Sequence, residues 1–443
     1  MSDRSQPMAH ADHLREVGRR TEIALASCGF DGVLFHAGEP VGLFEDDQHF
    51  PYKAHPTFKL WAPLLDAPGS VVLFQPGKTP RLIFRVATDF WYQPAERPRG
   101  GWSDSFELVE VRSDEELRGA LPRDLARWAW IGDPLSSLQR WGIGAVNPPT
   151  LMRRLDFDRA RKTPYELECL REASRLGARG HRAAEQCFRA GGSEFDIHQA
   201  FVAACGQREQ ELPYNAIVAL NEASSVLHYQ VLRRTPPKTH RSLLLDAGAS
   251  HAGYGSDITR TCSFADPDFA ALIAALDQLQ LGLCQCVRPG VDWRDIHLAA
   301  VERTATLLVE AGVLRCSVEE AIESGTSRLF FPHGIGHLLG LQVHDVGGTM
   351  AGPEGGTLPK PPRDPALRMT RKLEPGFVVT MEPGVYFIDA LLGPARESAH
   401  AARINWTRVE QLRPFGGIRI EDDLAVTENG CENLTRDAFA AIR

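Results

Sequence analysis

Four acidic residues in the second half of the chain lie in or beside apolar segments, where an unpaired carboxylate is costly. Asp246 ends the apolar run "SLLLD", Asp257 precedes "ITRTCSF", Glu382 ends "GFVVTME", and Glu421 lies within "GIRIEDDLAV". Carboxylates that are buried close together repel one another unless they share a proton or hold a cation between them. Each acid could instead be a turn residue or a surface charge, but the apolar surroundings favour a bound cation.

The segment "SLLLDAGASHAGYGSDITRTCSF" predicts a β-hairpin, because two apolar runs flank a turn-rich centre. If His251 and Ala252 form its two-residue turn, Asp246 and Asp257 face each other directly across the two strands. Their β-carbons would then lie about 4.5–5.5 Å apart. A pair of acids at this distance in apolar strands indicates a metal site more strongly than two independent charges.

Glu421 has a second interpretation. Arg419 stands two residues before it and would lie on the same face of a strand, so the two side chains could neutralise each other. The sequence therefore leaves a structural ion pair open beside a metal-binding role for Glu421.

Three histidines are concentrated in the stretch "FFPHGIGHLLGLQVHD", residues 330–345. His333 and His337 have the spacing of the H-E-x-x-H zinc motif, but Gly334 stands where that motif has glutamate. The glycines of the stretch also disfavour a regular helix. We therefore expect an extended or turning segment in which His337 binds a metal, while His333 and His344 donate hydrogen bonds to a substrate oxygen.

Together these residues form an oxygen-rich set of candidate metal ligands. Its members are Asp246, Asp257, His337, Glu382 and Glu421. The four carboxylates carry four negative charges, which two divalent cations would neutralise. Such a set suits Mn²⁺, Mg²⁺ or Fe²⁺ better than a thiolate zinc site. Two such ions about 3.5–4 Å apart can bind one water molecule and lower its pKa.

The segments that must position these side chains divide into two predicted domains. In the first third, short apolar runs such as "DGVLFHAG", "SVVLFQPG", "RLIFRVA", "FELVEV" and "RWAWIGDP" predict strands, with helical patterns such as "HLREVGRRTEIALASC" between some of them. Residues 1–155 are therefore predicted to form an α/β domain. A long helix then opens at "KTPYELECLREA", with Thr163 as its N-cap, Pro164 as its first residue and Glu166 completing a capping box. Residues 156–443 are predicted to form an α+β domain.

Two segments of the second domain resemble each other. "GGSEFDIHQAF" and "PGVDWRDIHLAA" share the triplets Asp196-Ile197-His198 and Asp295-Ile296-His297. The match is either a coincidence or the trace of a duplicated half, which would place a site between two pseudo-symmetric halves. Residues 350–368 are rich in Pro and Gly and predict a long loop of the kind that often covers a site.

Composition excludes several classes of protein. The 443 residues have a net charge of -8 and no long Lys/Arg run, which argues against a nucleic-acid surface or binding to anionic lipid. No apolar stretch approaches the length that spans a bilayer, and the first residues lack the apolar core of a signal peptide. The nine cysteines are scattered, as expected for reduced thiols in a cytoplasmic protein.

The order Asp, Asp, His, Glu, Glu, with the motifs "LLLDAGA", "SDITRT", "PHGIGHLLGLQVHDVGG", "MEPGVYF" and "GGIRIEDDLAV", resembles the pita-bread metallopeptidases. Within them the chain is most similar to the bacterial proline dipeptidases, or prolidases, including those called organophosphorus acid anhydrolases. The similarity extends from "LFEDDQHFPYKAHPTFKLW" to the tail "GCENLTRD". It implies a creatinase-like amino-terminal domain for dimerisation and site-capping, and a pita-bread catalytic domain with pseudo-two-fold halves.

The resemblance implies a role for each metal ligand. Asp246 would bind one ion, and Asp257 and Glu421 would bridge both ions. His337 and Glu382 would serve the other ion. Two divalent ions per subunit are implied, and Mn²⁺ is the ion we expect.

The resemblance also assigns the residues around the metals. Arg368, in "LRMTRKLEPG", matches the arginine that holds the carboxylate of a dipeptide. His228, His333 and His344 match the histidines that contact substrate and transition state, and Arg419 matches an active-site arginine.

Three further positions carry implications from the resemblance. Tyr214 and Val343 fall where the anhydrolases line their substrate pockets. Asp47 matches an acidic residue that reaches the site of a neighbouring subunit, which implies a homodimer with shared sites. Cys262 departs from relatives that have an aromatic residue there, which puts local packing or pocket width in question.

The expected function is hydrolysis of Xaa-Pro dipeptides to a free amino acid and proline, by a hydroxide that two metal ions activate, with Glu382 as the proton shuttle. A side activity on organophosphate triesters is also expected. One alternative is an Xaa-Pro aminopeptidase acting on longer peptides. Another is a binding module without catalysis, against which the complete ligand set argues.

Overall fold

The computed structural model describes residues 10–87, 90–91 and 93–442, and the chain separates into two compact units. The first unit comprises Met1–Arg159, Thr163–Glu168 and Gly352–Gly356. The second comprises Ala160–Lys162, Cys169–Ala351 and Thr357–Arg443. The predicted domain boundary after residue 155 falls within helix α5 (Pro149–Arg159). The roles expected for the two domains stay predictions at this point.

A six-stranded mixed sheet forms the centre of the first unit, in the order β4-β3-β2-β1-β5-β6. Its strands are β1 (Gly32–His36), β2 (Val71–Phe74), β3 (Arg81–Arg85), β4 (Glu107–Val111), β5 (Trp128–Ile131) and β6 (Ala145–Val146). Strand β2 runs antiparallel to β1 and β3, and the other neighbours are parallel. The five apolar runs that predict strands are all confirmed, whereas β6 is too short for its pattern to be recognised.

Helices cover both faces of this sheet. They are α1 (His10–Cys28), α2 (Pro56–Lys59), α3 (Asp114–Ala120), α4 (Leu138–Trp141) and α5 (Pro149–Arg159), with the 3₁₀ helix η1 (Gly101–Ser105). Val33 and Phe35 of β1 pack in one core with residues of α1 and α5, while Leu34 packs in another core with residues of α3 and α4. Burial on both faces explains why these strands are continuous apolar runs in the sequence.

Helix α6 (Pro164–Arg189) begins as the sequence predicts. The Thr163 backbone N–H donates to Glu166 Oε2 at 2.9 Å, and the Glu166 backbone N–H donates to Thr163 Oγ1 at 3.4 Å. This reciprocal pair is a capping box, which satisfies two donors that would otherwise lack partners at the start of a helix. His13 adds a further contact, with Nδ1 2.8 Å from Thr163 Oγ1.

The strands of the second unit form small sheets. One has the order β11-β8-β7, another β14-β17-β18, and β15 pairs with β16. The strands are β7 (Ile217–Leu220), β8 (Ser242–Asp246), β9 (Ser250–His251), β10 (Tyr254–Gly255), β11 (Thr259–Ser263), β12 (Met350–Gly352), β13 (Gly355–Thr357), β14 (Val378–Met381), β15 (Gly384–Tyr386), β16 (Gly417–Arg419), β17 (Asp422–Val426) and β18 (Cys431–Asn433). The turn of the β12-β13 hairpin, Gly352–Gly356, is grouped with the first unit.

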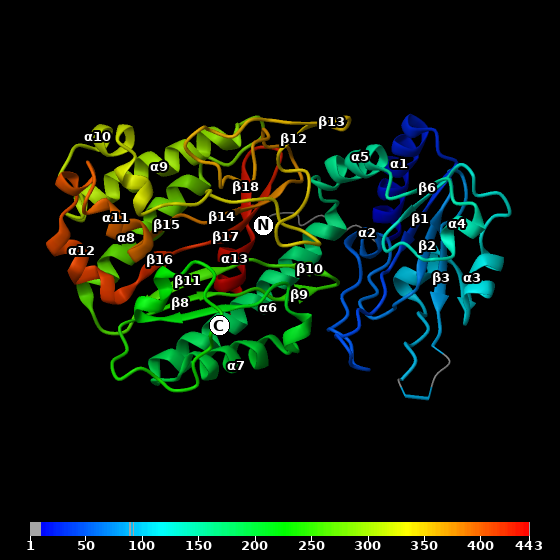
Figure 1. Ribbon diagram of the computed structural model, residues 1–443, viewed down its shortest axis with the longest axis horizontal. Helices are drawn as coiled ribbons and strands as arrows, with labels where there is room; N and C mark the ends of the chain where they lie inside the picture. Colours follow the sequence, from blue (N-terminus) through cyan, green and yellow to red (C-terminus); the bar gives the residue numbers. More distant parts are fainter. Residues whose placement is uncertain (1–9, 88–89, 92, 443) are drawn as a thin grey trace. The chain divides into compact units, whose positions relative to one another are not determined.

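Helices pack on the outer sides of these sheets. The α-helices are α7 (Glu194–Cys205), α8 (Pro267–Cys284), α9 (Trp293–Glu310), α10 (Val318–Glu323), α11 (Asp389–Ala395), α12 (Trp406–Leu412) and α13 (Leu434–Ala441). The 3₁₀ helices are η2 (Glu209–Glu211), η3 (Asn221–Ser225), η4 (Thr326–Leu329), η5 (Ala401–Arg403) and η6 (Arg413–Phe415). Helices α6 and α7 share a core with β7 and β8, and α8 and α9 share a core with β14 and β17. Figure 1 shows α7 below the strands of this unit and α9 above them.

The predicted hairpin forms, but its register differs from the expected one. Strand β9 pairs with β10 through Tyr254↔His251, so the two turn residues are Ala252 and Gly253. Both have positive φ, at 50° and 87°, which is the geometry of a type I′ turn and is readily adopted by glycine. The continuing pair of β8 and β11 therefore places Thr259, not Asp257, opposite Asp246.

The two similar triplets occupy equivalent places. Asp196-Ile197-His198 lies in the first turns of α7, and Asp295-Ile296-His297 lies in the first turns of α9. Both helices begin at an acceptor side chain, Ser193 and Asp292 respectively. The shared location agrees with a duplicated half, which stays a prediction.

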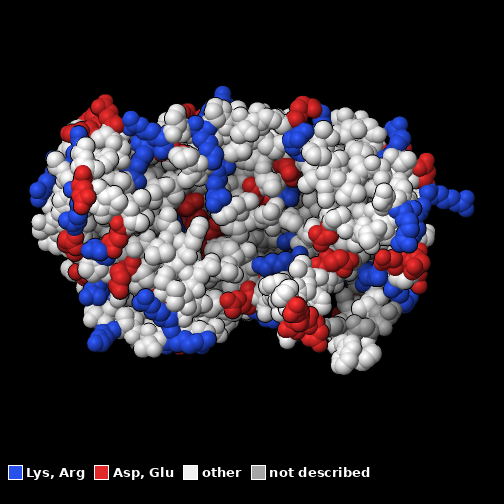
Figure 2. Space-filling view, viewed as in Figure 1, with Lys and Arg blue, Asp and Glu red and all other residues white. Residues whose placement is uncertain are grey.

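The displayed surface has charges of both signs. Acidic and basic side chains are interspersed over the face that Figure 2 displays. Within residues 10–442, leaving aside 88–89 and 92, no helix has both the length and the apolar character needed to cross a bilayer.

The capping box at the start of α6 yields a prediction about stability. We expect Thr163→Ala to lower the free energy of unfolding by about 1 kcal/mol, because the Glu166 N–H loses its acceptor and the contact of the hydroxyl with His13 is lost. Urea denaturation followed by circular dichroism measures the change. Ser27→Ala, which removes an exposed hydroxyl in the last turn of α1, serves as the control and should leave the midpoint in place. Equal midpoints for the two variants would contradict the capping role.

Candidate functional site

The second unit contains a cavity of about 680 Å³. Every residue that the sequence assigned to the site lines this cavity, with the exception of Asp47. The assigned residues at its wall are Tyr214, His228, Asp246, Asp257, His333, His337, Val343, His344, Arg368, Glu382, Arg419 and Glu421. The fold therefore brings to one place side chains that are spread over half of the sequence.

Alternation along β8 turns Asp246 toward the cavity. Leu243 and Leu245 pack in the core shared with α6 and α7, whereas Leu244 packs on the opposite side against Tyr386. Successive side chains of a strand point to opposite faces. Asp246, two residues after Leu244, therefore points away from the helices and into the cavity.

Glu382 follows the same rule at the end of β14. Val379 and Met381 pack in the core shared with α8 and α9, so the intervening positions face the cavity. The segment that carries His337 runs along this strand, because the Thr380 N–H donates to the His337 carbonyl at 3.0 Å. The approach requires Gly336, since a β-carbon there would lie 2.1 Å from the Thr380 carbonyl oxygen.

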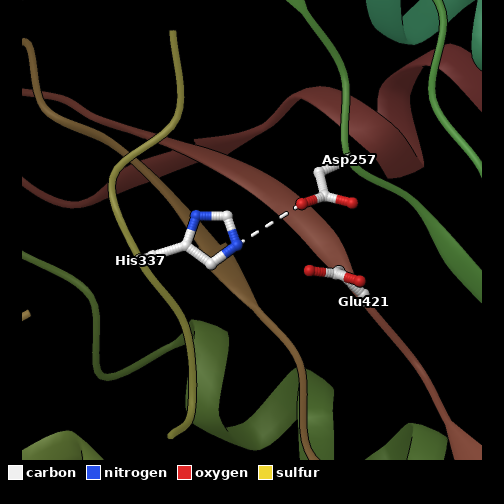
Figure 3. Close-up of side chains that lie close together, drawn as sticks. All are labelled: Asp257, His337 and Glu421. Atoms are coloured by element: carbon white, nitrogen blue, oxygen red, sulfur yellow. Dashed lines mark ion pairs between the residues drawn. The ribbon is translucent and has the colours of Figure 1, made fainter. Parts of the chain in front are cut away.

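Three of the five predicted ligands form a compact group. One ligand atom each from Asp257, His337 and Glu421 lies within 4.8 Å of the other two, and all three residues are buried. Figure 3 shows the three side chains pointing toward one another from separate segments, with 3.4 Å between His337 Nε2 and Asp257 Oδ2. Across the part of the chain that the structure describes, this is the one group of three or more such side chains close enough to hold an ion.

The His337 ring is oriented for metal binding. Its Nδ1 lies 3.0 Å from the Leu338 carbonyl oxygen, which can accept only from a protonated nitrogen. In the neutral ring the lone pair is then on Nε2, the atom that faces Asp257. Glu382 Oε1 lies 3.8 Å from the same nitrogen. The donor set thus fits divalent cations with oxygen and imidazole ligands.

Burial makes the negative charge of this site expensive. Desolvation raises the pKa of Glu382 to about 7 and holds the pKa of Asp246 and Glu421 above their usual ranges, with neighbouring carboxylates adding to the effect. Burial also opposes ionisation of Asp257, but hydrogen bonding and charge from His337 lower its pKa overall. Cations between these groups would relieve the repulsion.

The partner of Arg419 differs from the one that the sequence left open. Arg419 Nη2 donates to Asp246 Oδ2 at 2.6 Å, so the arginine neutralises Asp246 and not Glu421. Tyr214 donates to the other oxygen of Asp246 at 2.8 Å. Glu421 is held by Thr259, whose hydroxyl donates to Glu421 Oε2 at 2.7 Å and accepts from Arg419 Nε at 3.1 Å.

Sequence reasoning did not assign Tyr386, which links two site residues. Its hydroxyl accepts from Arg419 Nη1 at 2.9 Å and lies 2.9 Å from His333 Nε2. Gly384 and Gly417 make room for the ring, because a β-carbon at either would lie within 2.7 Å of it. In the sequence, the only signal of this role was the position of Tyr386 in the motif "MEPGVYF", two residues after Gly384.

Asp423 is a second residue that sequence reasoning did not assign. Its carboxylate is fully buried and accepts the backbone N–H of Asp257, at 3.1 Å to Oδ2 and 3.3 Å to Oδ1. Ser174 donates to Oδ2 from α6. The contact fixes the backbone of Asp257, a candidate bridging ligand. In the sequence Asp423 is only the third of three consecutive acids, which gives no signal of this contact.

The three assigned histidines outside the group have different environments. His333 is held between the Tyr386 hydroxyl and the Gly334 carbonyl, and burial with the nearby Arg419 charge lowers its pKa to about 3. His344 is exposed at the wall, with its ring 4.5 Å from that of His337. His228 is also exposed at the wall. These positions suit contact with a bound molecule.

Asp47 and Cys262, which the sequence singled out for different reasons, do not line the cavity. Asp47 belongs to the first unit and is exposed on a turn closed by the backbone bridge between Gly42 and His49. Its reach into a neighbouring subunit stays a prediction. Cys262 of β11 packs against the core shared with α6 and α7, so the departure at this position concerns packing under those helices.

Two family profiles match the chain. The profile of "Metallopeptidase family M24" matches residues 168–428, and that of "Xaa-Pro dipeptidase, N-terminal domain" matches residues 8–157. Every assigned residue except Asp47 lies in the first match, and Asp47 lies in the second.

Curated relatives match over the full length. The Xaa-Pro dipeptidase of Stenotrophomonas maltophilia (strain K279a) is 48% identical over 433 residues, which are 98% of this chain and 97% of the relative. The Xaa-Pro dipeptidase of Xanthomonas oryzae pv. oryzae (strain MAFF 311018) is 47% identical over 443 residues, with 100% of both chains covered.

Solved structures share the fold. Aminopeptidase P from Escherichia coli with the inhibitor Pro-Leu has a TM-score of 0.73 at 24% identity, covering 96% of this chain and 95% of that one. Proline aminopeptidase P II from Yersinia pestis has a TM-score of 0.71 at 23% identity, covering 96% and 98%. At these identities the likeness concerns the fold alone.

The contact between Thr259 and Glu421 yields a prediction about cation binding. We expect Thr259→Val to weaken binding of Mn²⁺ roughly 10- to 100-fold, because Glu421 loses the hydroxyl that orients it. Isothermal titration calorimetry on the metal-free protein measures the affinity.

Thr304→Val is the matched control for this variant. The Thr304 hydroxyl is buried in α9 and has no hydrogen-bond partner among the described residues, so its loss should leave the affinity unchanged. Equal affinities for Thr259→Val and the unaltered protein would rule out the orienting role.

Proposed function

Since the chain belongs to metallopeptidase family M24, we propose that it hydrolyses dipeptides with a carboxy-terminal proline to a free amino acid and proline. The observation that carries the proposal is a single cavity lined by both the Asp257, His337 and Glu421 group and the exposed Arg368. Two relatives at 47–48% identity over nearly the whole chain are Xaa-Pro dipeptidases, which supports the same substrate class.

An Xaa-Pro bond restricts how an enzyme can recognise it. Its nitrogen is part of the proline ring and has no hydrogen to donate. A dipeptide also has two charged ends, which can be bound directly. Arg368 supports binding at the carboxylate end, because a guanidinium pairs with both carboxylate oxygens and stays charged at any physiological pH.

Asp246, Asp257, His337, Glu382 and Glu421 would hold two divalent cations, for which we propose Mn²⁺. When bound, such ions would lower the pKa of a shared water molecule and so supply the nucleophile near neutral pH. Arg419 and Tyr214 would keep Asp246 ionised and oriented through the contacts at 2.6 and 2.8 Å. Thr259 would do the same for Glu421.

The remaining site residues would act on the peptide. His344 would donate a hydrogen bond to the carbonyl oxygen as it gains negative charge. His333 would only line the substrate, because its Nδ1 faces the Gly334 carbonyl and its Nε2 faces the Tyr386 hydroxyl. The proline nitrogen must take up a proton to leave, and Glu382 would deliver it from a carboxylate oxygen. His228, Tyr214 and Val343 would contact the Xaa side of the substrate.

Three finer properties are part of the proposal. Asp47 would complete the site of a neighbouring subunit in a homodimer, for which its exposure on a turn is suitable. A cytoplasmic location accords with nine cysteines that are scattered along the chain, as expected for reduced thiols. Triesters of phosphoric acid would be a side substrate, because their tetrahedral centre resembles the transition state of peptide hydrolysis.

The alternative is an Xaa-Pro aminopeptidase that acts on longer peptides. It would need space beyond the proline, where the dipeptidase interpretation places Arg368. The position and the charge of Arg368 favour a dipeptide as substrate. Comparing the cleavage rates of a dipeptide and a longer peptide discriminates between the two functions.

We expect turnover of Ala-Pro to be lost after dialysis against EDTA and to return when Mn²⁺ is added. Ala-Pro-Ala should be cleaved roughly tenfold more slowly or worse, because its proline carboxylate is no longer free to pair with Arg368. Release of free alanine reports both rates, because cleavage of the Ala-Pro bond frees the first residue of either peptide. Faster cleavage of the tripeptide would favour the aminopeptidase, and activity that ignores EDTA would contradict the metal-dependent proposal.

We expect His344→Ala to lower kcat for Ala-Pro on the order of a hundredfold or more, because one hydrogen-bond donor to the developing oxyanion is lost. Steady-state kinetics at saturating Mn²⁺ measures the effect. His251→Ala removes an exposed histidine on β9 that does not line the cavity, and it should leave kcat unchanged. Unchanged turnover in His344→Ala rules out this role.

A further inference from the structure

The segment that carries Arg368 forms a closed loop, residues 358–370, which we call the strap. The Leu358 N–H donates to the Thr349 carbonyl and the Thr370 N–H to the Gly348 carbonyl, each at 2.9 Å. Thr370 Oγ1 also donates to the Leu358 carbonyl at 3.2 Å. The two ends of the strap are therefore held together, and its middle must be positioned by other contacts.

The strap packs tightly beside the cavity. Leu367 is fully buried, and its Cα would lie 2.9 Å from a β-carbon at Gly334, next to His333. Its neighbours Ala366 and Arg368 line the cavity. A small movement of the strap would thus displace the Arg368 guanidinium from the carboxylate end of the substrate.

Asp364, near the middle of the strap, is clamped by two groups of the protein body. Arg328 of η4 donates to both of its oxygens, Nε to Oδ1 at 2.7 Å and Nη2 to Oδ2 at 3.0 Å. His297 of α9 places Nε2 3.4 Å from Oδ1. Burial opposes ionisation of Asp364, yet the neighbouring His297 and Arg328 hold its pKa below the usual value. The carboxylate is only 9% exposed, so these contacts are protected from water.

Other contacts of the strap lie at the surface. Arg363 Nη1 donates to the Glu323 carbonyl at the end of α10, and Lys360 Nζ donates to the Pro365 carbonyl, each at 2.7 Å. Contacts of exposed charged side chains contribute little, because solvent screens them and side-chain entropy is lost. The buried clamp at Asp364 is therefore the stronger anchor.

The contact between His297 and Asp364 involves one of the two similar triplets described above. His297 is the histidine of the second triplet, and its counterpart His198 lies 3.7 Å from Glu209, whose side chain is 62% exposed. Both histidines are buried beside an acid of a following segment. In the second copy that acid belongs to the strap at the cavity.

We propose that Asp364, held by Arg328 and His297, is a positioning residue that fixes the strap and thereby presents Arg368 to the carboxylate of a dipeptide. The inference rests on the proposed function, since it gives Arg368 its substrate. Without the clamp, the strap would have to become ordered when substrate binds, and that cost would weaken binding. The effect concerns recognition of the carboxylate and leaves the bond-breaking step unaffected.

Asp364→Asn tests the proposal with two substrates, Ala-Pro and its uncharged amide, on the Mn²⁺-loaded full-length enzyme. For Ala-Pro we expect KM to rise roughly three- to thirtyfold, with kcat within about twofold of the original value. For the amide, which has no carboxylate to bind, kcat/KM should stay unchanged. A merely structural weakening would lower both rates together. Unchanged KM for Ala-Pro overturns the inference.

Arg368→Met separates this inference from the proposed function. Because Asp364 acts through Arg368, the double variant should have the KM of Arg368→Met alone, whereas independent effects would multiply. If Arg368→Met raises KM and Asp364→Asn does not, the inference fails while the proposed function stands. If Arg368→Met leaves KM for Ala-Pro unchanged, the carboxylate role of Arg368 fails, and the inference fails with it.

Two further variants guard against a trivial outcome. Asp268→Asn breaks another two-pronged Asp–Arg pair, with Arg408, at a position that does not line the cavity, and it should leave both KM values unchanged. If thermal denaturation shows that Asp364→Asn does not fold, Arg328→Lys is used as the test variant instead. Lysine keeps the positive charge but cannot pair with both oxygens of Asp364. The same rise in KM for Ala-Pro alone is expected, and its absence overturns the inference.

Discussion

The second unit is organised around the repulsion of four carboxylates within one cavity. Asp246 is neutralised by Arg419, whereas Asp257 and Glu421 lie beside His337, and Glu382 lies between His337 and His333. Carboxylates buried this close together are stable only when opposite charges or cations lie among them. An apolar interior without such charges would not accommodate them. Three features hold these acids together in spite of the repulsion. They are the alternation of side chains along the strands, the close approach of the backbone at Gly336 to β14, and the side chains behind the ligands.

A layer of hydrogen bonds behind the ligands makes this arrangement rigid. Thr259 binds Glu421, and Asp423 binds the backbone of Asp257. Tyr386 joins Arg419 to His333, so the neutralising arginine and a candidate substrate contact share one phenol oxygen. Groups that are oriented in advance need not reorganise when a ligand arrives, which is why such second layers matter for metal affinity and for catalysis.

Local patterns predicted much of this fold. Apolar runs located β1 to β5, and the residues Thr163, Pro164 and Glu166 located the start of α6. Chemical type and order indicated the candidate metal ligands, whereas the family resemblance supplied the other residues assigned to the cavity wall. The pairing of distant residues was less accessible. The hairpin register depended on which two residues could take positive φ, and Gly253 decided it in favour of a turn one residue later than expected. The ion-pair partner of Arg419 and the contacts of Tyr386 could not be predicted, because the partners come from other strands and no local pattern records them.

The distance along the chain between contacting site residues has a consequence for biosynthesis. Arg419 and Asp246 touch across 173 positions, and Glu421 follows two positions after Arg419. A growing chain on the ribosome therefore has no complete ion pocket until Glu421 has been added. Since ion capture follows assembly of the pocket, the ion that is captured is set by the free ion concentrations where the finished chain folds, as much as by the affinity of the pocket itself.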